Sequence, residues 1–337
     1  MKILVTGGLG FIGSHTVVAL QQKGYDVVII DDLSNATIEV VDGITTITGQ
    51  KPALEQIDLR DKQAVFHFFD KHRDIAGVIH FAASKAVGES MKLPLEYYEN
   101  NFFSLINVLS AMKQIGLDKI IFSSSCTVYG QGEIMPITEE ESIKTALSPY
   151  GNTKQVGEEI IVDLAKVYPL QAVLLRYFNP IGAHESGCIG ESPVGVPYNL
   201  IPYITQTAVG TRPFLSIYGD DYDTPDGTCV RDYIHVVDLA DAHLRAMEYL
   251  LKKENTTQVE VFNVGNGQGY SVLELVHSFE RVSGIKINYK IVERRPGDVD
   301  KAWANTAKIE RVLGWKPTKS LDDMLASAWN WERKSRN

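Results

Sequence analysis

Short runs of apolar, β-branched residues alternate with segments of helical periodicity through the first half of the chain. Five of these runs predict strands, at residues 3–6, 26–30, 77–81, 119–123 and 172–177. Between them, apolar residues recur every three or four positions, which predicts helices over 14–23, 104–114 and 154–166. Strands that alternate with helices form right-handed βαβ units, so the pattern predicts an α/β fold with a doubly wound parallel sheet.

The pattern changes after Asn179. From Pro180 to Pro202 the chain is rich in Gly and Pro, which indicates an irregular excursion rather than a strand or a helix. Patterned segments return at 230–251, 261–264 and 273–282. We therefore expect residues 1–179 to form the main domain and residues 180–337 to form a smaller mixed α/β lobe, with some segments returning to the main domain.

A glycine-rich segment follows the first predicted strand and precedes the first predicted helix. It reads Gly-Gly-Leu-Gly-Phe-Ile-Gly over residues 7–13, so glycines recur at every third position. A tight turn, a close approach of the backbone to a pyrophosphate and close packing of helix on strand all exclude a Cβ. Free amides at the helix N-terminus then meet the phosphate charge. The segment predicts a dinucleotide site on a Rossmann-type sheet.

The next strand ends in Asp31-Asp32, about 20 residues after the glycines. A carboxylate at this place binds a ribose 2′-hydroxyl and repels a 2′-phosphate, which predicts NAD rather than NADP. Asp58 follows the third apolar run and is a candidate to reach the adenine. The small residues Ala82 and Ala83 end a further strand, where the backbone can lie against a cofactor.

Tyr150 and Lys154 stand four residues apart, hence on one face of a predicted helix. A free phenol has a pKa of about 10, too high for an efficient base near neutral pH. We expect the Lys154 ammonium, together with a nicotinamide cation, to lower the pKa of Tyr150. The serines 123–125 end a strand at the carboxyl edge of the sheet, where ligands bind in such folds, and one of their hydroxyls can share a substrate proton with Tyr150.

Composition restricts the partners and the compartment. The chain has 337 residues and a net charge of −9, which argues against binding to nucleic acid. No apolar run approaches the length of a membrane span, and the first strand begins at residue 2, which argues against a signal peptide. Three cysteines, in no CxxC pair, favour reduced thiols over disulfides or a metal site. We expect a cytoplasmic protein.

Together these motifs resemble the extended short-chain dehydrogenase/reductase family over essentially the whole chain. The resemblance is carried by TGGLGFIGSHT (6–16), HFAASKAVGES (80–90), PLEYYENN (94–101), FSSSCTVYG (122–130), SPYGNTK (148–154), LLRYFNPIGAH (174–184), VRDYIHVVDLADAH (230–243) and RRPGD (294–298). It extends to the members that invert C4 of UDP-hexoses. It implies that the base takes the proton of the sugar 4-hydroxyl while the C4 hydride passes to NAD. The 4-keto sugar then turns and receives the hydride on its other face, interconverting UDP-glucose and UDP-galactose.

The resemblance also assigns residues. It implies that Ser125 is the hydroxyl partner of the base Tyr150, and that Lys154 supports the base and binds a ribose. With the glycine loop included, the expected cofactor contacts are Gly7, Gly10, Phe11, Ile12, Gly13, Asp31, Asp32, Asn35, Asp58, Leu59, Phe81, Ala82, Ala83, Lys85, Asn100, Ser123, Tyr150, Lys154 and Phe178. The expected substrate contacts are Ser125, Asn179, Asn199, Leu200, Ser216, Tyr218, Arg231, Arg295, Asp298 and Ala302. Members of the family are usually homodimers, and no metal is expected.

Two places depart from the family pattern, and the milder departure is Ala83-Ser84, where bacterial members of the family are expected to carry Gly-Leu. Four residues after Asp298 the family places a side chain that closes the sugar pocket, and a tyrosine there restricts the pocket to UDP-glucose and UDP-galactose. Here the residue is Ala302, which implies space for a 2-acetamido group. UDP-N-acetylglucosamine and UDP-N-acetylgalactosamine are therefore further expected substrates, unless a bulky neighbour such as Trp303 refills the space.

Two other functions share this scaffold. A nucleotide-sugar 4,6-dehydratase or a decarboxylase uses the same fold, cofactor and Tyr–Lys pair, but is expected to carry acids directly after the serine, where this chain has Cys126-Thr127. A non-catalytic regulator that senses NAD is the alternative from another class. Such proteins commonly lose the Tyr–Lys pair, which this chain retains.

Overall fold

The computed structural model describes residues 1–130, 132, 134–193, 195–197, 199–295 and 298–335. The chain forms two compact units, each built from separate segments. Unit 1 comprises Met1–Gly130, Ser142–Arg176 and Ala240–Phe262. Unit 2 comprises Gln131–Glu141, Tyr177–Leu239 and Asn263–Asn337. A single domain boundary after residue 179 stays a prediction, and the units add that 131–141 groups with the later part of the chain and 240–262 with the earlier part.

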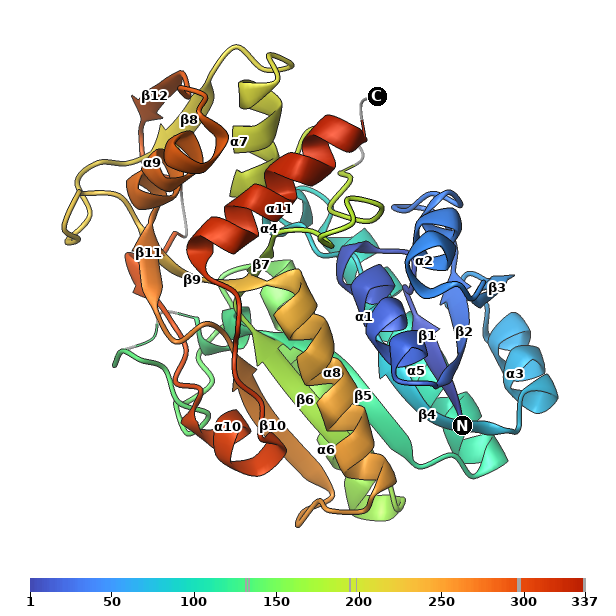
Figure 1. Cartoon of the computed structure of the whole chain (residues 1–337). Coiled ribbons are helices and arrows are strands. Elements are labelled where there is room, and N and C mark those ends of the chain that lie inside the picture. Colours follow the sequence, from blue (N-terminus) through green and yellow to red (C-terminus); the bar gives the residue numbers. More distant parts are fainter. Residues whose placement is uncertain (131, 133, 194, 198, 296–297, 336–337) are drawn as a thin grey trace. The chain divides into compact units, whose positions relative to one another are not determined.

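A seven-stranded sheet in the order β10-β6-β5-β4-β1-β2-β3 forms the centre of unit 1 (Figure 1). β1 pairs in parallel with β2 and β4, β2 with β3, and β4 with β5. The strand order reverses beside β1, which is the doubly wound arrangement and confirms the predicted fold class. The strands are β1 Lys2–Thr6, β2 Asp26–Asp31, β3 Ala53–Gln56, β4 Ile75–His80, β5 Lys119–Ser125, β6 Gln171–Tyr177 and β10 Val259–Val264.

Helices cover both faces of this sheet. α1 and α2 lie together on one face, and α5 and α6 lie together on the other (Figure 1). Apolar residues of α3, α5 and α6 form one continuous core with those of the strands, which excludes water from this face of the sheet. The helices are α1 Phe11–Gln22, α2 Val40–Thr48, α3 Lys62–Lys71, α4 Val87–Ser90, α5 Pro94–Ile115, the 3₁₀ helix η1 Cys126–Tyr129, α6 Pro149–Val167 and α8 Val236–Leu251.

All three predicted helices begin earlier than the periodicity predicts, and α1 begins at Phe11 rather than at residue 14. α5 begins at Pro94 and α6 at Pro149, because the fixed φ of proline suits the first helical position and its missing N–H has no partner there in any case. The Ser148 hydroxyl accepts a hydrogen bond from the Gly151 amide and caps α6. As a result, Tyr150 lies in the first turn of α6.

The described residues of unit 2 form smaller sheets and four helices that lie wholly within the unit. β11, β9 and β13 form one path, β7 pairs with β9, and β12 pairs with β8. The expectation that 180–202 holds neither strand nor helix is wrong at both ends, because Asn179–Ile181 pairs in parallel with β9 and α7 begins at Leu200. The elements are β7 Asn179–Ile181, α7 Leu200–Ala208, β8 Leu215–Tyr218, β9 Val230–His235, β11 Gly269–Ser271, α9 Val272–Ser283, β12 Tyr289–Val292, β13 Lys301–Ala302, α10 Ala307–Leu313 and α11 Leu321–Lys334.

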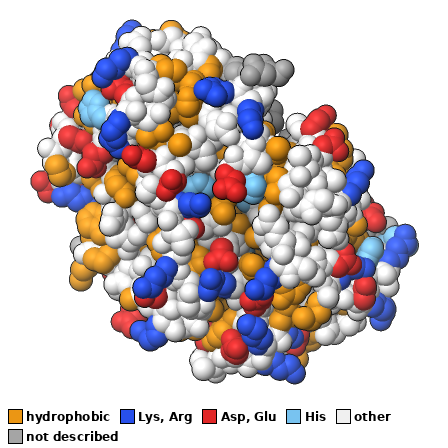
Figure 2. Space-filling view, in the orientation of Figure 1, with side chains coloured by type: hydrophobic (Ala, Val, Ile, Leu, Met, Phe, Trp, Pro, Cys, Tyr) orange, Lys and Arg blue, Asp and Glu red, His pale blue; other side chains and the backbone are white. Residues whose placement is uncertain are grey.

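Charged side chains of both signs lie on the surface. Figure 2 shows Lys and Arg interspersed with Asp and Glu over the face that it draws. Among the described residues, no helix is both long enough and apolar enough to cross a membrane.

Candidate functional site

Gly7 and Gly13, in the glycine loop between β1 and α1, have no room for a Cβ. Gly7 has a φ of +67°, in the left-handed region, and a Cβ there would lie 2.8 Å from the Ala82 amide nitrogen. A Cβ on Gly13 would collide with the carbonyl oxygen of Gly7. The loop, the first turn of α1 and the end of β4 are therefore packed backbone to backbone, as a pyrophosphate-binding turn requires.

Asp31 at the end of β2 is fixed against this loop. One carboxylate oxygen accepts the Leu9 amide and the other accepts the Leu33 amide, each at 3.0 Å. The side chain is buried, and burial raises the pKa of Asp31. Asp32 instead accepts the amide and hydroxyl of Ser34 in an exposed turn. Of the two acids, Asp31 is the one that the fold holds beside the glycines.

Other predicted cofactor residues of unit 1 have identifiable partners. The Lys85 ammonium lies 5.8 Å from the centroid of the Phe11 ring, which brings two predicted contacts together. Asn100 donates to the Ser84 hydroxyl at 3.1 Å. Asp58 forms a bidentate pair with Arg60, and this hydrogen-bonded guanidinium lowers the pKa of Asp58. Arg60 was not predicted, although it stands two residues from Asp58.

The remaining predicted cofactor residues lie on several elements. Ile12 is in α1, Asn35 follows β2, Leu59 is buried in the core, Phe81 packs on the His243 ring and Ala83 follows β4. Phe178 belongs to unit 2, where its amide donates to the Val264 carbonyl oxygen.

Ser125, Tyr150 and Lys154 meet at the carboxyl end of β5. The side chains of Ser125 and Tyr150 are hydrogen-bonded to one another. The Lys154 ammonium donates to the Ser123 carbonyl oxygen at 2.7 Å and lies 5.8 Å from the centroid of the Tyr150 ring. The four-residue spacing on α6 therefore places the phenol and the ammonium beside the serines, as predicted from the sequence.

The pKa of Tyr150 is raised, whereas the sequence analysis expected Lys154 and the cofactor to lower it. Burial raises the pKa of Tyr150 to about 12, and the hydrogen bond with Ser125 opposes this only in part. Burial also lowers the pKa of Lys154 to about 8. The side chains alone therefore keep Tyr150 protonated at neutral pH, because desolvation of the phenol outweighs its hydrogen bond with Ser125. A positive charge added beside the ring, such as an oxidised nicotinamide, lowers a phenol pKa.

The residues after Ser125 form η1. They include no carboxylate, because Cys126 and Thr127 occupy the first two positions. The Thr127 hydroxyl oxygen is buried and has no hydrogen-bond partner among the described residues. The site therefore lacks the acid and base that elimination of water needs directly after the serine.

Asn101 was not predicted, although it stands inside one of the motifs. Its side-chain amide donates to the Thr153 hydroxyl at 2.9 Å and to the Ser84 carbonyl oxygen at 3.0 Å, and its oxygen accepts the Ser84 amide. It therefore ties the segment after β4 to α6. Its place directly after the predicted Asn100, within the segment 94–101, is the sequence signal that would have indicated it.

In unit 2, one carboxylate holds two arginines. Asp298 accepts hydrogen bonds from Arg231 at 3.2 Å and from Arg295 at 3.0 Å. Arg231 is part of β9, and the Arg295 guanidinium lies 5.7 Å from the centroid of the Tyr218 ring. Two guanidinium groups at one place suit a diphosphate. Pro296 and Gly297, within the RRPGD motif, lie outside the described residues.

The other predicted substrate residues lie in or at the start of helices and strands of unit 2. Asn179 donates to the Asp232 carbonyl oxygen at 2.9 Å. Asn199 occupies the N-cap position of α7, Leu200 is its first residue, and Ser216 is in β8. The Asn199 amide donates to Glu191 at 2.5 Å.

Ala302 lies beside Arg231 across the β13–β9 pair. Cross-strand neighbours share a face of a sheet, and successive residues of a strand alternate between faces. The Trp303 ring lies over Gly269, where a Cβ would be 3.0 Å from the ring. Gly269 pairs with Asp232, the neighbour of Arg231 on β9, so the Trp303 ring lies toward the face opposite Arg231 and Ala302.

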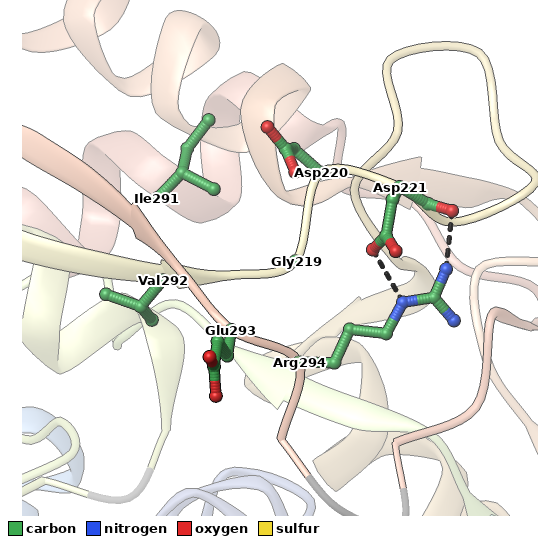
Figure 3. A pocket seen from close by; sticks show the side chains of 7 residues that line it. All are labelled: Gly219, Asp220, Asp221, Ile291, Val292, Glu293 and Arg294. Carbon is green, nitrogen blue, oxygen red and sulfur yellow. Dashed lines mark hydrogen bonds and ion pairs between the residues drawn. The ribbon is translucent and has the colours of Figure 1, made fainter.

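A separate hollow of unit 2 is lined by residues that the sequence analysis did not select. Figure 3 shows Asp220, Asp221 and Glu293 at its wall, with Arg294 bonded to Asp221. The Arg294 guanidinium donates to the Asp221 carboxylate at 2.6 Å and to its carbonyl oxygen at 2.5 Å, and lies 4.0 Å from the Tyr222 ring centroid. Three carboxylates against one arginine make the hollow unsuited to an anionic ligand.

Comparisons with known proteins cover the whole chain. Residues 4–328 match the family model described as GDP-mannose 4,6 dehydratase. A UDP-glucose 4-epimerase of Bacillus subtilis is 49% identical, covering 100% of this chain and 98% of that protein. A UDP-glucose 4-epimerase of Stenotrophomonas maltophila, crystallised with NAD and a formylated UDP-arabinopyranose, has a TM-score of 0.96 and 46% identity, covering 100% of this chain and 99% of that one. The Bifidobacterium longum enzyme of the same name, in complex with NAD⁺ and UDP, has a TM-score of 0.95, 46% identity and the same coverage.

Proposed function

The chain belongs to the UDP-glucose 4-epimerase family, and from this premise we propose that it interconverts UDP-glucose and UDP-galactose with NAD as its cofactor. The observation that carries the proposal is the cluster of Ser125, Tyr150 and Lys154, with Ser125 and Tyr150 hydrogen-bonded. The residues that fit NAD are the crowded glycine loop and Asp31, which accepts the loop amide of Leu9.

Residues of the chain itself transfer the proton of the sugar 4-hydroxyl in the proposed reaction. Tyr150 accepts the proton of the sugar 4-hydroxyl, and Ser125, which shares a hydrogen bond with Tyr150, gives that proton a path to the phenolate. NAD, when bound, would supply the reversible hydride acceptor for C4. Lys154 provides the positive charge that favours the phenolate. After the 4-keto sugar has turned, Tyr150 returns the proton, so that one residue serves both faces of the sugar.

Groups in unit 2 account for substrate retention. Arg231 and Arg295, aligned by Asp298, would bind the diphosphate and hold the nucleotide while the sugar turns. The dehydratase alternative is not favoured, because Cys126 and Thr127 stand where elimination needs acids. The retained Tyr–Lys pair likewise disfavours a non-catalytic regulator.

A coupled assay of UDP-galactose on protein purified without added NAD tests the proposal. We expect UDP-glucose as product, with no loss of water from the sugar. Tyr150→Phe should lower kcat by about 10²–10⁴-fold while NAD stays bound. Tyr168→Phe is the matched control and should stay active, because among the described residues its hydroxyl is hydrogen-bonded only to the Leu117 carbonyl oxygen. A dehydrated product, or a fully active Tyr150→Phe variant, would contradict the proposal.

We further propose that the N-acetylated UDP-hexoses are substrates. The support is the small side chain of Ala302 on the face of Arg231, with the Trp303 ring on the other face. The residue at this place decides how much space the sugar 2-substituent has, and a methyl side chain occupies little of it. Turnover of UDP-N-acetylgalactosamine beside UDP-galactose measures this directly.

A homodimer is also proposed. Leu95, Phe103 and Ile106 on α5 and Val162 on α6 are exposed apolar side chains on two helices that pack together. Apolar patches of this kind mark protein–protein contacts, and a second copy of the chain would cover them. Light scattering after size exclusion should give twice the chain mass. A cytoplasmic location stays a prediction.

A further inference from the structure

α6 presents a third buried group in line with the two that the proposed reaction uses. Tyr150, Lys154 and Glu158 follow one another at four-residue intervals, so they share one face of the helix. All three side chains are buried, with Glu158 only 4% exposed. A carboxylate at such a place needs a charged or hydrogen-bonding partner.

Glu158 has its partner in Arg176 of β6. Arg176 donates to both carboxylate oxygens, at 2.9 and 2.5 Å, and both side chains are buried. The remaining edge of the guanidinium donates to the Tyr129 hydroxyl at 3.1 Å. The Ser124 hydroxyl donates to Glu158 at 2.5 Å. Glu158 thus links α6 to β6, to η1 and to β5.

With the Ser124 contact, each of the three successive serines at the end of β5 is bonded to a residue of α6. Tyr150 is bonded to Ser125, Lys154 to the carbonyl oxygen of Ser123, and Glu158 to Ser124. Three successive serines of β5 are therefore each held by one of three residues that α6 places a turn apart. A shift of β5 against α6 would break all three bonds, so the Glu158 contact fixes the register on which the Ser125–Tyr150 bond depends.

The Glu158 carboxylate also lies near the Lys154 ammonium. Burial lowers the pKa of Lys154, and the nearby Glu158 carboxylate opposes this. The other groups around Lys154 are Tyr150 on α6, the Phe122 ring of β5 at 5.1 Å, and His80 on β4, whose pKa burial lowers to about 3 so that it is neutral. Arg176 lies behind Glu158 and is paired with it.

We propose that Glu158, anchored by Arg176, is a positioning residue for the epimerisation: it fixes the three serines against α6 and keeps Lys154 charged. This inference rests on the proposed function, in which Tyr150 and Lys154 act on the sugar. Glu158 itself touches neither sugar nor cofactor in this account.

Glu158→Gln tests the proposal, because it keeps the shape and removes the charge. We expect kcat to fall at least roughly tenfold with KM little changed, and the alkaline limb of the kcat–pH profile to move to lower pH. Glu158→Asp, which keeps the charge, should restore the limb toward its wild-type position. Asp163→Asn is the matched control on the same helix, because Asp163 is exposed and pairs only with Lys166 among the described residues.

The paired variant Glu158→Met with Arg176→Met covers the case in which Glu158→Gln does not fold. Replacing a buried ion pair by apolar residues often leaves stability unchanged. A folded double variant with a lowered kcat and a shifted limb supports the proposal. A folded double variant, or a folded Glu158→Gln, with the wild-type profile overturns it. A wild-type protein that does not epimerise UDP-galactose instead rejects the proposed function.

Discussion

The Lys154 ammonium donates its 2.7 Å hydrogen bond to the carbonyl oxygen of Ser123, not to the hydroxyl of Tyr150. The lysine is thereby held at the strand end, beside the ring of the tyrosine that it serves. In the proposed mechanism, Lys154 therefore acts on the phenol through its charge and not through a direct bond. That charge depends on pH, because burial lowers the pKa of Lys154 to about 8.

The wild-type enzyme should lose activity as the pH rises through about 8. Below that pH Lys154 is charged and favours the Tyr150 phenolate, and above it the ammonium loses its proton. Lys154→Arg stays charged throughout this range. The expected result is a lower kcat without an alkaline limb near pH 8, measured in the coupled assay from pH 6.5 to 9.5. If both proteins lose activity over the same alkaline pH range, the titrating group is not Lys154.

Gly13→Ala should destabilise the fold, because its Cβ collides with the carbonyl oxygen of Gly7. We expect the free energy of unfolding in urea to fall by about 1–3 kcal/mol, the range for overpacking a tight site. Gly10→Ala is the control in the same loop, since its Cβ would lie 3.3 Å from its nearest neighbour. Equal stability of the two variants would show that the loop relaxes freely.

Asp298→Asn should weaken substrate binding more than catalysis. The variant leaves Arg231 and Arg295 without the carboxylate that aligns them. We expect KM for UDP-galactose to rise by roughly tenfold, the size of one charged hydrogen bond, with kcat little changed. Asp221→Asn removes the neighbouring ion pair with Arg294 and should leave both constants near wild type. A fall in kcat alone would argue against the assigned role.

Ala302→Tyr should abolish turnover of UDP-N-acetylgalactosamine and spare that of UDP-galactose. A tyrosine on the face of Arg231 would occupy the space that the acetamido group needs. Both sugars are assayed on the same preparation, so the unacetylated substrate is the internal control. Loss of both activities would indicate damage to β13 and not a closed pocket.

Much of unit 1 followed from the sequence, because its signals are local. The glycine spacing, the acids ending β2 and the Tyr150–Lys154 spacing each depend on neighbours in the chain, and the structure places them on a loop, a strand end and a helix face. The starts of α5 and α6 were predicted too late. The signal there was a proline at the first helical position, which carries no hydrophobic periodicity.

What the sequence left out depends on distant segments. Glu158 continues the four-residue spacing of Tyr150 and Lys154, yet a glutamate in a helix is usually solvated, and only the fold brings Arg176 against it. The sequence analysis also expected the pKa of Tyr150 to be lowered, whereas burial raises it. Burial is a property of the assembled core and cannot be seen in the sequence. Asp298 was selected, but its pairing with two arginines was not.

Asp31 has a consequence for any attempt to change the cofactor. Its carboxylate is the group expected to reject a 2′-phosphate, and the same carboxylate anchors the glycine loop through the amide of Leu9. A replacement that admits NADP therefore also removes one tie of the loop to β2, although the Gly7 amide still donates to the Ile30 carbonyl oxygen. Cofactor preference and loop order are coupled in this protein, and an engineered switch must supply a new acceptor for the Leu9 amide.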